Sequence, residues 1–277
     1  MVSRLTVSVV TYRTPPAVLS ATLDSLAGAA EVAQRQAQLA DIYLAMVVND
    51  AESGSCEFLK KLLSRSGYRV FRQITLYSGQ GNVGYGVGHN RALQHSVTDY
   101  HLVLNPDVVL APGALTDALC FMATHPGAGL LAPRVDDENG GRQYLCKRYP
   151  SVLGLLLRGF APVWIRQRFA AILHHYEMRE LLDSGRVVWD FPIASGCFML
   201  FRTRMVQAVG GFSPCFFLYF EDFDLSLRIG QVGRTVYVPS VQIVHLGGQA
   251  ARKGWRHIRW FGHSMVRFFN RHGWRWY

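Results

Sequence analysis

Short apolar runs alternate with helical patterns through the first part of the chain. Several runs are rich in branched aliphatic residues and have the length of buried strands. Between them, positions such as Leu19, Leu23 and Leu26 recur at the spacing of a helix face. Strands are predicted at residues 5–11, 43–48, 70–77 and 102–104, and helices around 19–30, 58–63 and 89–97. This alternation predicts an α/β fold with a Rossmann-like, mainly parallel sheet flanked by helices.

Beyond Pro112 the alternation becomes irregular. Helices are predicted at residues 115–122, 152–182 and 221–230, and strands at 130–132, 194–201, 236–238 and 241–244. No internal repeat or low-complexity linker divides the chain. We therefore expect one domain over residues 1–250, followed by an appendage over residues 251–277.

The strand at residues 102–104 ends abruptly in Asn105-Pro106-Asp107. Proline cannot continue a central strand, because it lacks the backbone N–H. In open α/β sheets, ligands bind outside the carboxyl ends of the strands. Asp107 therefore stands where a carboxylate can hold a divalent cation against substrate phosphates. The alternative is a turn or helix-capping aspartate without a ligand.

A second acidic motif, Glu221-Asp222-x-Asp224, follows a run of apolar and aromatic residues at 216–220. Burial beside aromatic rings raises the pKa of a carboxyl group and makes it a better general base near neutral pH. Asp222 is the candidate base, with Glu221 or Asp224 orienting it. The alternative is a helix N-terminus that attracts acidic residues through the helix dipole.

The glycine-rich stretch at residues 79–88 contains Gly79-x-Gly81-x-x-Gly84, which matches the dinucleotide-binding fingerprint. That fingerprint belongs to the first strand–helix turn of such folds, whereas this stretch follows the third predicted strand. A nicotinamide or flavin site is therefore disfavoured. The glycines are better explained by a close approach of the backbone to a sugar or phosphate.

The charge balance is strongly basic and uneven. There are 29 basic and 19 acidic residues, which gives a net charge of +10, and residues 225–277 contain no acidic side chain. Such asymmetry points to an anionic partner. The five cysteines form no C-x-x-C pair, which disfavours a zinc site or a disulfide framework and favours a reducing cytoplasm. We expect no transmembrane helix.

The segment from residue 252 to residue 277 combines arginines with aromatic side chains. On a helix, one face would carry Trp255, Ile258, Phe261, Met265, Phe268 and Phe269, with Arg252, Arg256, Arg259 and Arg267 elsewhere. A basic helix with an aromatic face is typical of membrane interfaces, and we expect it to bind an anionic membrane surface. The alternatives are a helix packed on the domain and a nucleic-acid-binding segment.

Seven short motifs together carry a resemblance to a known family. They are residues 7–12 (VSVVTY), 47–50 (VVND), 81–90 (GNVGYGVGHN), 104–107 (LNPD), 196–200 (GCFML), 211–212 (GF) and 220–225 (FEDFDL). In this order they resemble the inverting family 2 glycosyltransferases of the GT-A fold. The details of the third, fourth and last motifs resemble bacterial rhamnosyltransferases of O-antigen and cell-wall assembly.

The resemblance implies roles for individual residues. The residues it assigns to the nucleotide sugar are Thr11, Tyr12, Arg13, Asp50, Asn82, Gly84, Asn90, Asn105 and Asp107. It assigns Asp107 and His245 to a Mg²⁺ or Mn²⁺ ion, although a lone histidine is often only structural. Asn105 stands where the general pattern has an aspartate. Asp222 would deprotonate the acceptor hydroxyl, supported by Glu221 and Asp224. On the acceptor side we expect Trp189, Asp190, Ser195, Arg134 and Arg148.

The sequence as a whole favours an enzyme that transfers L-rhamnose from dTDP-L-rhamnose, with inversion. Its expected acceptor is a lipid-linked or lipopolysaccharide glycan, including one on a polyprenyl diphosphate. Its expected location is peripheral, on the cytoplasmic face of the bacterial cell membrane. The first alternative is the same fold with another donor, such as a UDP-hexose or UDP-GlcNAc. The second is a basic nucleic-acid-binding protein, although no nucleic-acid partner is expected for the favoured enzyme.

Overall fold

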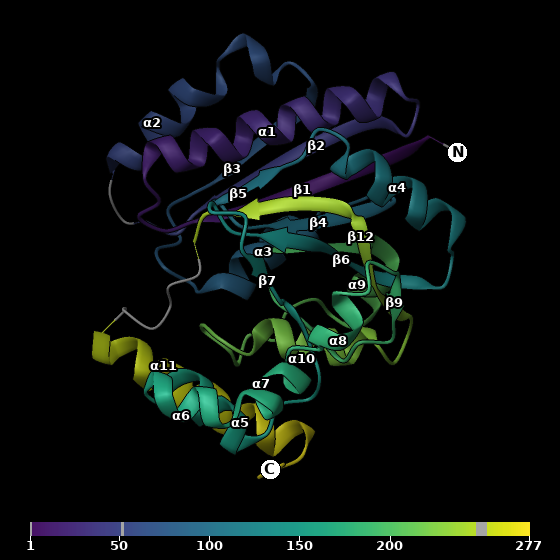
Figure 1. Ribbon diagram of the computed structural model, residues 1–277. Coiled ribbons are helices and arrows are strands. Elements are labelled where there is room, and N and C mark those ends of the chain that lie inside the picture. The colour runs from purple at the N-terminus through teal and green to yellow at the C-terminus, as the bar shows by residue number, and fades with distance from the viewer. Residues whose placement is uncertain (1, 51–52, 248–253) are drawn as a thin grey trace.

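The computed structural model describes residues 2–50, 53–247 and 254–277, and has a central sheet with helices on both faces (Figure 1). The elements of the first part are β1 (Ser3–Thr11), α1 (Pro16–Arg35), β2 (Leu39–Val48), α2 (Ser53–Leu63), the 3₁₀ helix η1 (Ser66–Tyr68), β3 (Phe71–Tyr77), α3 (Tyr85–Leu93) and β4 (Tyr100–Leu104). The strands β3, β2, β1 and β4 are neighbours in that order, and each pair is parallel. The predicted parallel sheet is therefore present in this part of the chain.

The second part extends the sheet with strands of both directions. Its elements are β5 (Val108–Leu110), α4 (Ala114–Thr124), β6 (Ala128–Asp136), β7 (Arg142–Gln143), β8 (Cys146–Lys147), α5 (Val152–Phe160), α6 (Val163–Arg168), α7 (Ala170–Tyr176), α8 (Arg179–Leu182), β9 (Val188–Trp189), β10 (Ile193–Ala194), β11 (Phe198–Arg202), α9 (Thr203–Ala208), α10 (Glu221–Ile229), β12 (Arg234–His245) and α11 (Gly254–His272). The strand β11 runs antiparallel to β4 and β6, whereas β12 is parallel to β6. The sheet as a whole is therefore mixed.

Several element boundaries differ from the sequence prediction. The long helix expected at residues 152–182 is four short helices, α5 to α8. Pro162 caps the start of α6 and cannot continue α5, and Met178, with φ of 52°, turns the chain before α8. The glycine-rich stretch extends into α3, which begins at Tyr85 and not near His89. Its Gly86 and Gly88 pack closely on neighbouring side chains. A Cβ would lie 2.7 Å from Phe212 at Gly86 and 2.8 Å from Val10 at Gly88.

Separate apolar cores lie on the two faces of the sheet. On one face, Leu19, Leu23 and Leu26 of α1 are buried with residues of α4, as the helical spacing predicted. On the other face, Leu225 and Ile229 of α10 are buried in the core beneath β11 and β6. The sheet is thus covered by α1 and α4 on one side and by α3 and α10 on the other (Figure 1).

A third core joins the C-terminal helix to the rest of the molecule. Phe268 and Phe269 of α11 are fully buried against Phe220 and Phe223 beside α10 and Leu155 of α5. The other end of the expected aromatic face is different, since Trp255 and Ile258 are exposed. The side chain of Arg256 is not described. Arg252 and the expected boundary at residue 250 lie outside the described residues. None of the described helices is both long and apolar enough to cross a bilayer.

Candidate functional site

The carboxyl ends of β1 and β2 are tied together where the sequence predicts nucleotide binding. The backbone N–H of Arg13 donates to both carboxylate oxygens of Asp50, at 2.7 and 2.9 Å, and Arg13 has a φ of 52°. The N–H of Asn49 donates to the carbonyl of Thr11 at 2.9 Å. Tyr12 stands half-exposed beside them. This corner therefore presents an aromatic side chain and a fixed carboxylate at one sheet edge.

The next loop adds Asn82 and Gly84 to the same edge. Asn49 Nδ2 donates to the Gly84 carbonyl at 3.0 Å, and the Gly84 N–H donates to Asn82 Oδ1 at 3.1 Å. Gly84 has a φ of 86°, and a Cβ there would lie 2.4 Å from the carbonyl oxygen of Phe217. Only glycine fits this turn. Asn90 is committed elsewhere, because its amide bonds to both the N–H and the carbonyl of Phe212.

Asp107 and His245 face each other at the ends of β4 and β12. Asp107 Oδ1 lies 3.4 Å from His245 Nε2. Gln143 Nε2 donates to the His245 carbonyl at 3.2 Å, which leaves Gln143 Oε1 to accept from His245 Nδ1 at 3.0 Å. The hydrogen bond to Gln143 therefore orients the imidazole so that its Nε2 lies toward the Asp107 carboxylate.

This arrangement fits a divalent cation. Asp107 Oδ1 and Asn105 Oδ1 are buried and have no hydrogen-bond partner among the described residues. One carboxylate, completed by phosphate oxygens, is a usual protein contribution to a Mg²⁺ site, and imidazole is a common metal ligand. Within the described parts of the chain, no group of three or more His, Cys, Asp or Glu side chains is placed to share a metal. Asp107 and His245 would therefore hold the ion together with the substrate.

Asp222 is held in the first turn of α10 by backbone donors. Gly196 N–H donates to its Oδ2 at 2.9 Å, and Phe223 N–H donates to its Oδ1 at 3.0 Å. Burial raises the pKa of the Asp222 carboxyl group, and the charge of Lys147 and these two donors partly oppose that rise. The result is a fixed, buried carboxylate whose proton affinity exceeds that of an ordinary aspartate, as a general base requires.

Asp107 and Asp222 converge on one region of the molecule. The Asn105 N–H donates to the Cys197 carbonyl at 2.9 Å, one residue from the Gly196 N–H that holds Asp222. After burial, the charges of Asp107 and Asp222 both raise the pKa of the Cys197 thiol. Both carboxylates likewise contribute to the raised pKa of Tyr85, whose hydroxyl donates to the Gly196 carbonyl.

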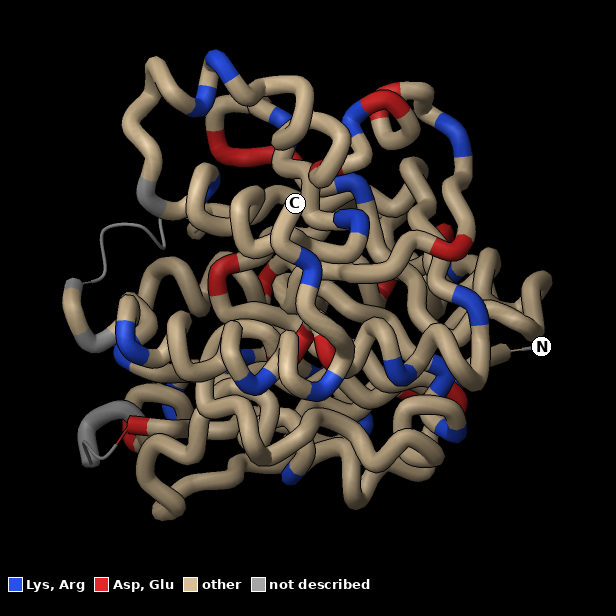
Figure 2. Tube along the Cα trace, turned by 90° about the horizontal axis from the view of Figure 1, so that it is seen from below, with Lys and Arg blue, Asp and Glu red and all other residues tan. Residues whose placement is uncertain are grey.

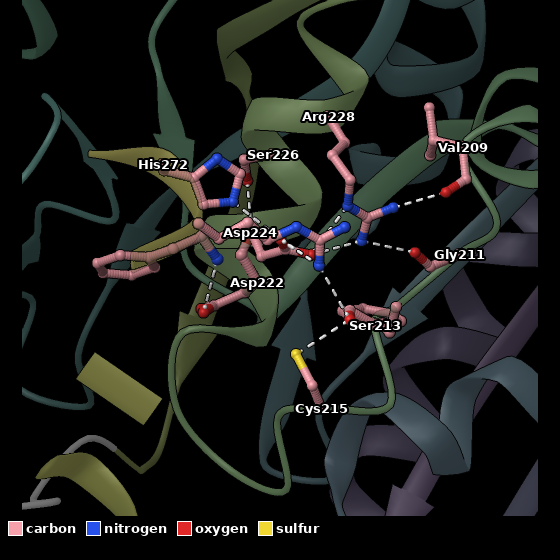
Figure 3. Close-up of polar contacts among 12 residues, drawn as sticks. Val209, Gly211, Ser213, Cys215, Asp222, Asp224, Ser226, Arg228 and His272 are labelled. Atoms are coloured by element: carbon pink, nitrogen blue, oxygen red, sulfur yellow. Dashed lines mark hydrogen bonds and ion pairs between the residues drawn. The ribbon is translucent and has the colours of Figure 1, made fainter. Parts of the chain in front are cut away.

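The neighbouring acids do not orient Asp222 as the sequence suggested. Asp224 is fully buried and contacts Arg228 at 2.6 Å and His272 at 2.9 Å (Figure 3). Arg271 lies 3.2 Å from Oδ1, the oxygen that His272 contacts. The carboxylate oxygens of Asp224 are engaged by these side chains and do not bind Asp222. The backbone N–H groups of Gly196 and Phe223 position Asp222 instead. Glu221 is buried, and burial followed by the charge of Asp222 raises its pKa.

Two of the expected acceptor-side residues lie far from this region. Trp189 packs under the guanidinium of Arg234, and Asp190 forms an exposed ion pair with the same arginine at 2.6 Å. Arg234 begins β12 and His245 ends it. At about 3.3 Å per residue, about 36 Å of strand separates the two ends. The short strand β9, which carries Trp189, pairs with the end of β12 that is distant from His245. The predicted acceptor-side position of Trp189 and Asp190 is therefore wrong.

The other three expected acceptor-side residues lie in three different places. Ser195 directly precedes Gly196 and therefore lies beside Asp222. Arg134 pairs with Asp136 at 3.0 Å near the end of β6, in the part of the sheet that contains His245. Arg148 pairs with Glu180 at the surface.

One buried charged residue near Asp222 escaped the sequence analysis. Lys147 on β8 is only 3% exposed, and its ammonium lies 5.4 Å from the ring centre of Phe223. Its strand has only two residues, so no periodicity marks it. The available signal was its type, since it is one of four lysines in a chain whose other basic residues are arginines.

Comparison with known proteins settles the family. The family model "Glycosyltransferase like family 2" matches residues 3–262, which is most of the chain. The chain belongs to glycosyltransferase family 2. Among solved structures of similar fold, the mannosyltransferase PcManGT from Pyrobaculum calidifontis in complex with GDP-Man and Mn²⁺ is 17% identical. The match covers 98% of this chain and 64% of PcManGT, with a TM-score of 0.64. GalNAc-T7 with UDP, GalNAc and Mn²⁺ is 14% identical. That match covers 97% of this chain and 48% of GalNAc-T7, with a TM-score of 0.65. The expected GT-A fold is thereby confirmed.

Two family 2 relatives carry names that describe an activity. The N-acetylglucosaminyl-diphospho-decaprenol L-rhamnosyltransferase of Mycobacterium tuberculosis is 31% identical over 189 residues, 63% of this chain. The chain covers only 59% of the length of that relative. The rhamnosyltransferase WbbL of Escherichia coli is 28% identical over 200 residues, which are 68% of this chain and 71% of WbbL.

Proposed function

We propose that this family 2 glycosyltransferase transfers L-rhamnose from dTDP-L-rhamnose, with inversion, to a glycan acceptor carried on a lipid diphosphate. Two of its relatives are named as rhamnosyltransferases, and one of those names specifies a diphospho-decaprenol acceptor. The observation that carries the proposal is the convergence of Asp107 and Asp222 through the Asn105–Cys197 and Gly196–Asp222 hydrogen bonds. In an inverting transfer, a metal on the departing diphosphate and a base on the acceptor hydroxyl would both have to lie close to the same anomeric carbon.

The chain's own residues have distinct tasks in this mechanism. Asp222 takes the proton of the acceptor hydroxyl as that oxygen bonds to the anomeric carbon, while the bond from that carbon to the nucleoside diphosphate breaks on the opposite side. Asp107 and His245 would hold Mg²⁺ or Mn²⁺, as two solved structural neighbours carry Mn²⁺. When bound, the ion neutralises charge on the departing diphosphate. Asp50, Tyr12 and Gly84 would form the nucleotide corner.

The donor is tested with a panel of nucleotide sugars. Purified protein is incubated with Mn²⁺, a lipid-diphosphate GlcNAc acceptor and, separately, dTDP-L-rhamnose, UDP-glucose, UDP-GlcNAc and GDP-mannose, and the released nucleoside diphosphate is measured. We expect release mainly from dTDP-L-rhamnose. Preferential use of a UDP sugar would replace the donor and keep the family. No release with any donor, together with a salt-dependent shift of RNA or DNA, would favour the nucleic-acid-binding alternative.

The metal site gives a prediction that does not depend on turnover. Asp107→Asn is expected to weaken Mn²⁺ binding in the presence of dTDP at least tenfold, because it removes the charged one of two protein ligands. The measurement is titration of free Mn²⁺ by electron paramagnetic resonance. Glu57→Gln, an exposed carboxylate change on α2, is the matched control and leaves the affinity unchanged. Equal affinities for both variants would remove Asp107 from the site.

The proposed membrane contact extends beyond the C-terminal helix to α5, α6 and α7. Residues 139–176 and 225–277 contain no acidic side chain. The exposed apolar side chains of the first segment are Leu153, Leu156, Val163, Trp164, Phe169 and Ile172. The two segments are joined, since the first N–H groups of α5 donate to the carbonyls of Arg275 and Trp276 at 2.8 and 3.1 Å. Their helices lie together in Figure 1, and Figure 2 shows Lys and Arg around the C-terminus. Exposed tryptophan among arginines is typical of a membrane interface.

Vesicle binding tests this contact and the peripheral location on the inner membrane face. Trp164→Ser combined with Ile172→Ser is expected to lower binding to phosphatidylglycerol vesicles roughly tenfold or more, because two apolar side chains lose their contact with lipid. Val97→Ser, which removes an 81% exposed apolar side chain before β4, is the control. The readout is co-sedimentation with anionic and with neutral vesicles. Equal binding of both variants would exclude α6 and α7 from the contact.

A further inference from the structure

Lys147 occupies a buried position next to the candidate base. Its strand β8 pairs with β10, with Ile193 opposite Lys147, and the chain continues from β10 into Gly196, whose N–H holds Asp222. The Lys147 ammonium packs near the ring of Phe223, the residue that follows Asp222. Lys147 thus lies against the same two segments that fix the Asp222 carboxylate.

The burial of this cation is costly and is not balanced by a direct ion pair. Among the described residues, no carboxylate lies within ion-pair distance of the Lys147 ammonium. Burial, followed by the charge of Arg158, lowers the pKa of Lys147 to about 7, while Asp222 and Glu177 oppose this. A buried lysine without a partner is destabilising, so its presence beside Asp222 calls for a functional reason.

The other titratable groups around Lys147 and Asp222 are neutral or paired elsewhere, so that Lys147 is the cation that interacts with the Asp222 carboxylate. Burial raises the pKa values of Cys146, Cys197, Tyr85 and Tyr176, which stay neutral. The pKa of Glu221 is also raised, and Arg158 pairs with Glu177 at 3.6 Å. Lys147 is the largest of the influences that oppose the effect of burial on Asp222.

We propose that Lys147 is a positioning residue for sugar transfer, whose ammonium keeps the Asp222 carboxylate ionised and in place until it accepts the acceptor proton. This inference rests on the proposed role of Asp222. A nearby opposite charge favours the ionised form of a carboxyl group, and the Lys147 charge acts in this direction on Asp222. Each member of the pair is therefore expected to change the proton affinity of the other, and the tests replace each member in turn.

The first test is the pH profile of kcat/KM for the acceptor. Lys147→Met is expected to move the acid limb to higher pH by about one unit, because the base loses its neighbouring cation and binds its proton more tightly. Lys147→Arg keeps a charge there and is expected to retain the wild-type limb. The affinity for dTDP is expected to stay unchanged in both. An unshifted limb in Lys147→Met overturns the proposal, and so does a raised acceptor KM with an unshifted limb, which would indicate direct contact with the acceptor.

The second test needs no replacement of Lys147. With ¹³C-labelled lysine the protein gives only four Cε signals, and that of Lys147 is expected to titrate near pH 7, well below the usual range of a lysine side chain. Asp222→Asn is expected to move this midpoint down by about one unit, because the ammonium loses its anion. An unchanged midpoint overturns the inference. If Asp222→Asn transfers sugar at the wild-type rate, the proposed role of Asp222 fails instead.

Discussion

Asp222→Asn is expected to lower the turnover of sugar transfer by 10²- to 10⁴-fold, the range that a positioned general base contributes. Asparagine has nearly the same shape and can still accept the Gly196 N–H bond through its amide oxygen, which keeps the loop in place. It cannot take the proton of the acceptor hydroxyl. In the wild type, burial raises the pKa of Asp222, so activity is expected to fall, as pH decreases, at a higher pH than for an ordinary aspartate. The measurement is the initial rate of acceptor glycosylation across pH.

The control for this variant separates chemistry from donor binding. The proposed nucleotide corner of Asp50, Tyr12 and Gly84 does not include Asp222, and its Asp50 is held at the ends of β1 and β2 by the N–H of Arg13. Titration with dTDP and Mn²⁺ is therefore expected to give the same affinity in Asp222→Asn as in the wild type. Near-normal turnover would exclude Asp222 as the base. Loss of dTDP binding would show that the variant had disturbed the site as a whole.

The fold could be predicted where a strand is rich in apolar or β-branched residues. Residues 5–11 and 102–104 are buried on both faces, so composition alone identifies them, and the parallel pairing of β1 and β4 follows from the helices between them. The mixed half of the sheet could not be predicted in this way. Strands β7 to β10 have two residues each, too few to show any periodicity.

The same limit explains which site residues were found. Asp107 and Asp222 are marked by motifs, and the structure brings their neighbourhoods together. Gln143 and Lys147 contact candidate site residues or their neighbours from two-residue strands, so nothing local in the sequence identifies them. Trp189 was misplaced because its two-residue strand β9 pairs with the beginning of β12, and such a tertiary contact leaves no periodic pattern in the sequence.

Asp224→Asn is expected to lower the free energy of unfolding by about 3 kcal/mol or more, because removing one partner of a buried ion pair leaves charge uncompensated. Asp224 is fully buried, and Arg228 beside it is largely buried and also donates to the carbonyls of Val209 and Gly211 (Figure 3). Arg228 cannot turn to solvent without breaking those bonds. The melting temperature is expected to fall by roughly 6–12 °C, measured by differential scanning calorimetry.

Asp190→Asn is the matched control for Asp224→Asn. Asp190 binds Arg234 through two hydrogen bonds of 2.9 and 2.6 Å, but both side chains are more than half exposed, so its loss is expected to leave the melting temperature almost unchanged. Equal melting temperatures for the two variants would show that the Asp224 cluster contributes little. A large difference has a functional consequence as well. Arg271 and His272 lie at the end of α11, and Asp224, which they contact, lies on α10. This cluster therefore fixes the proposed membrane-binding helix to the helix that carries Asp222.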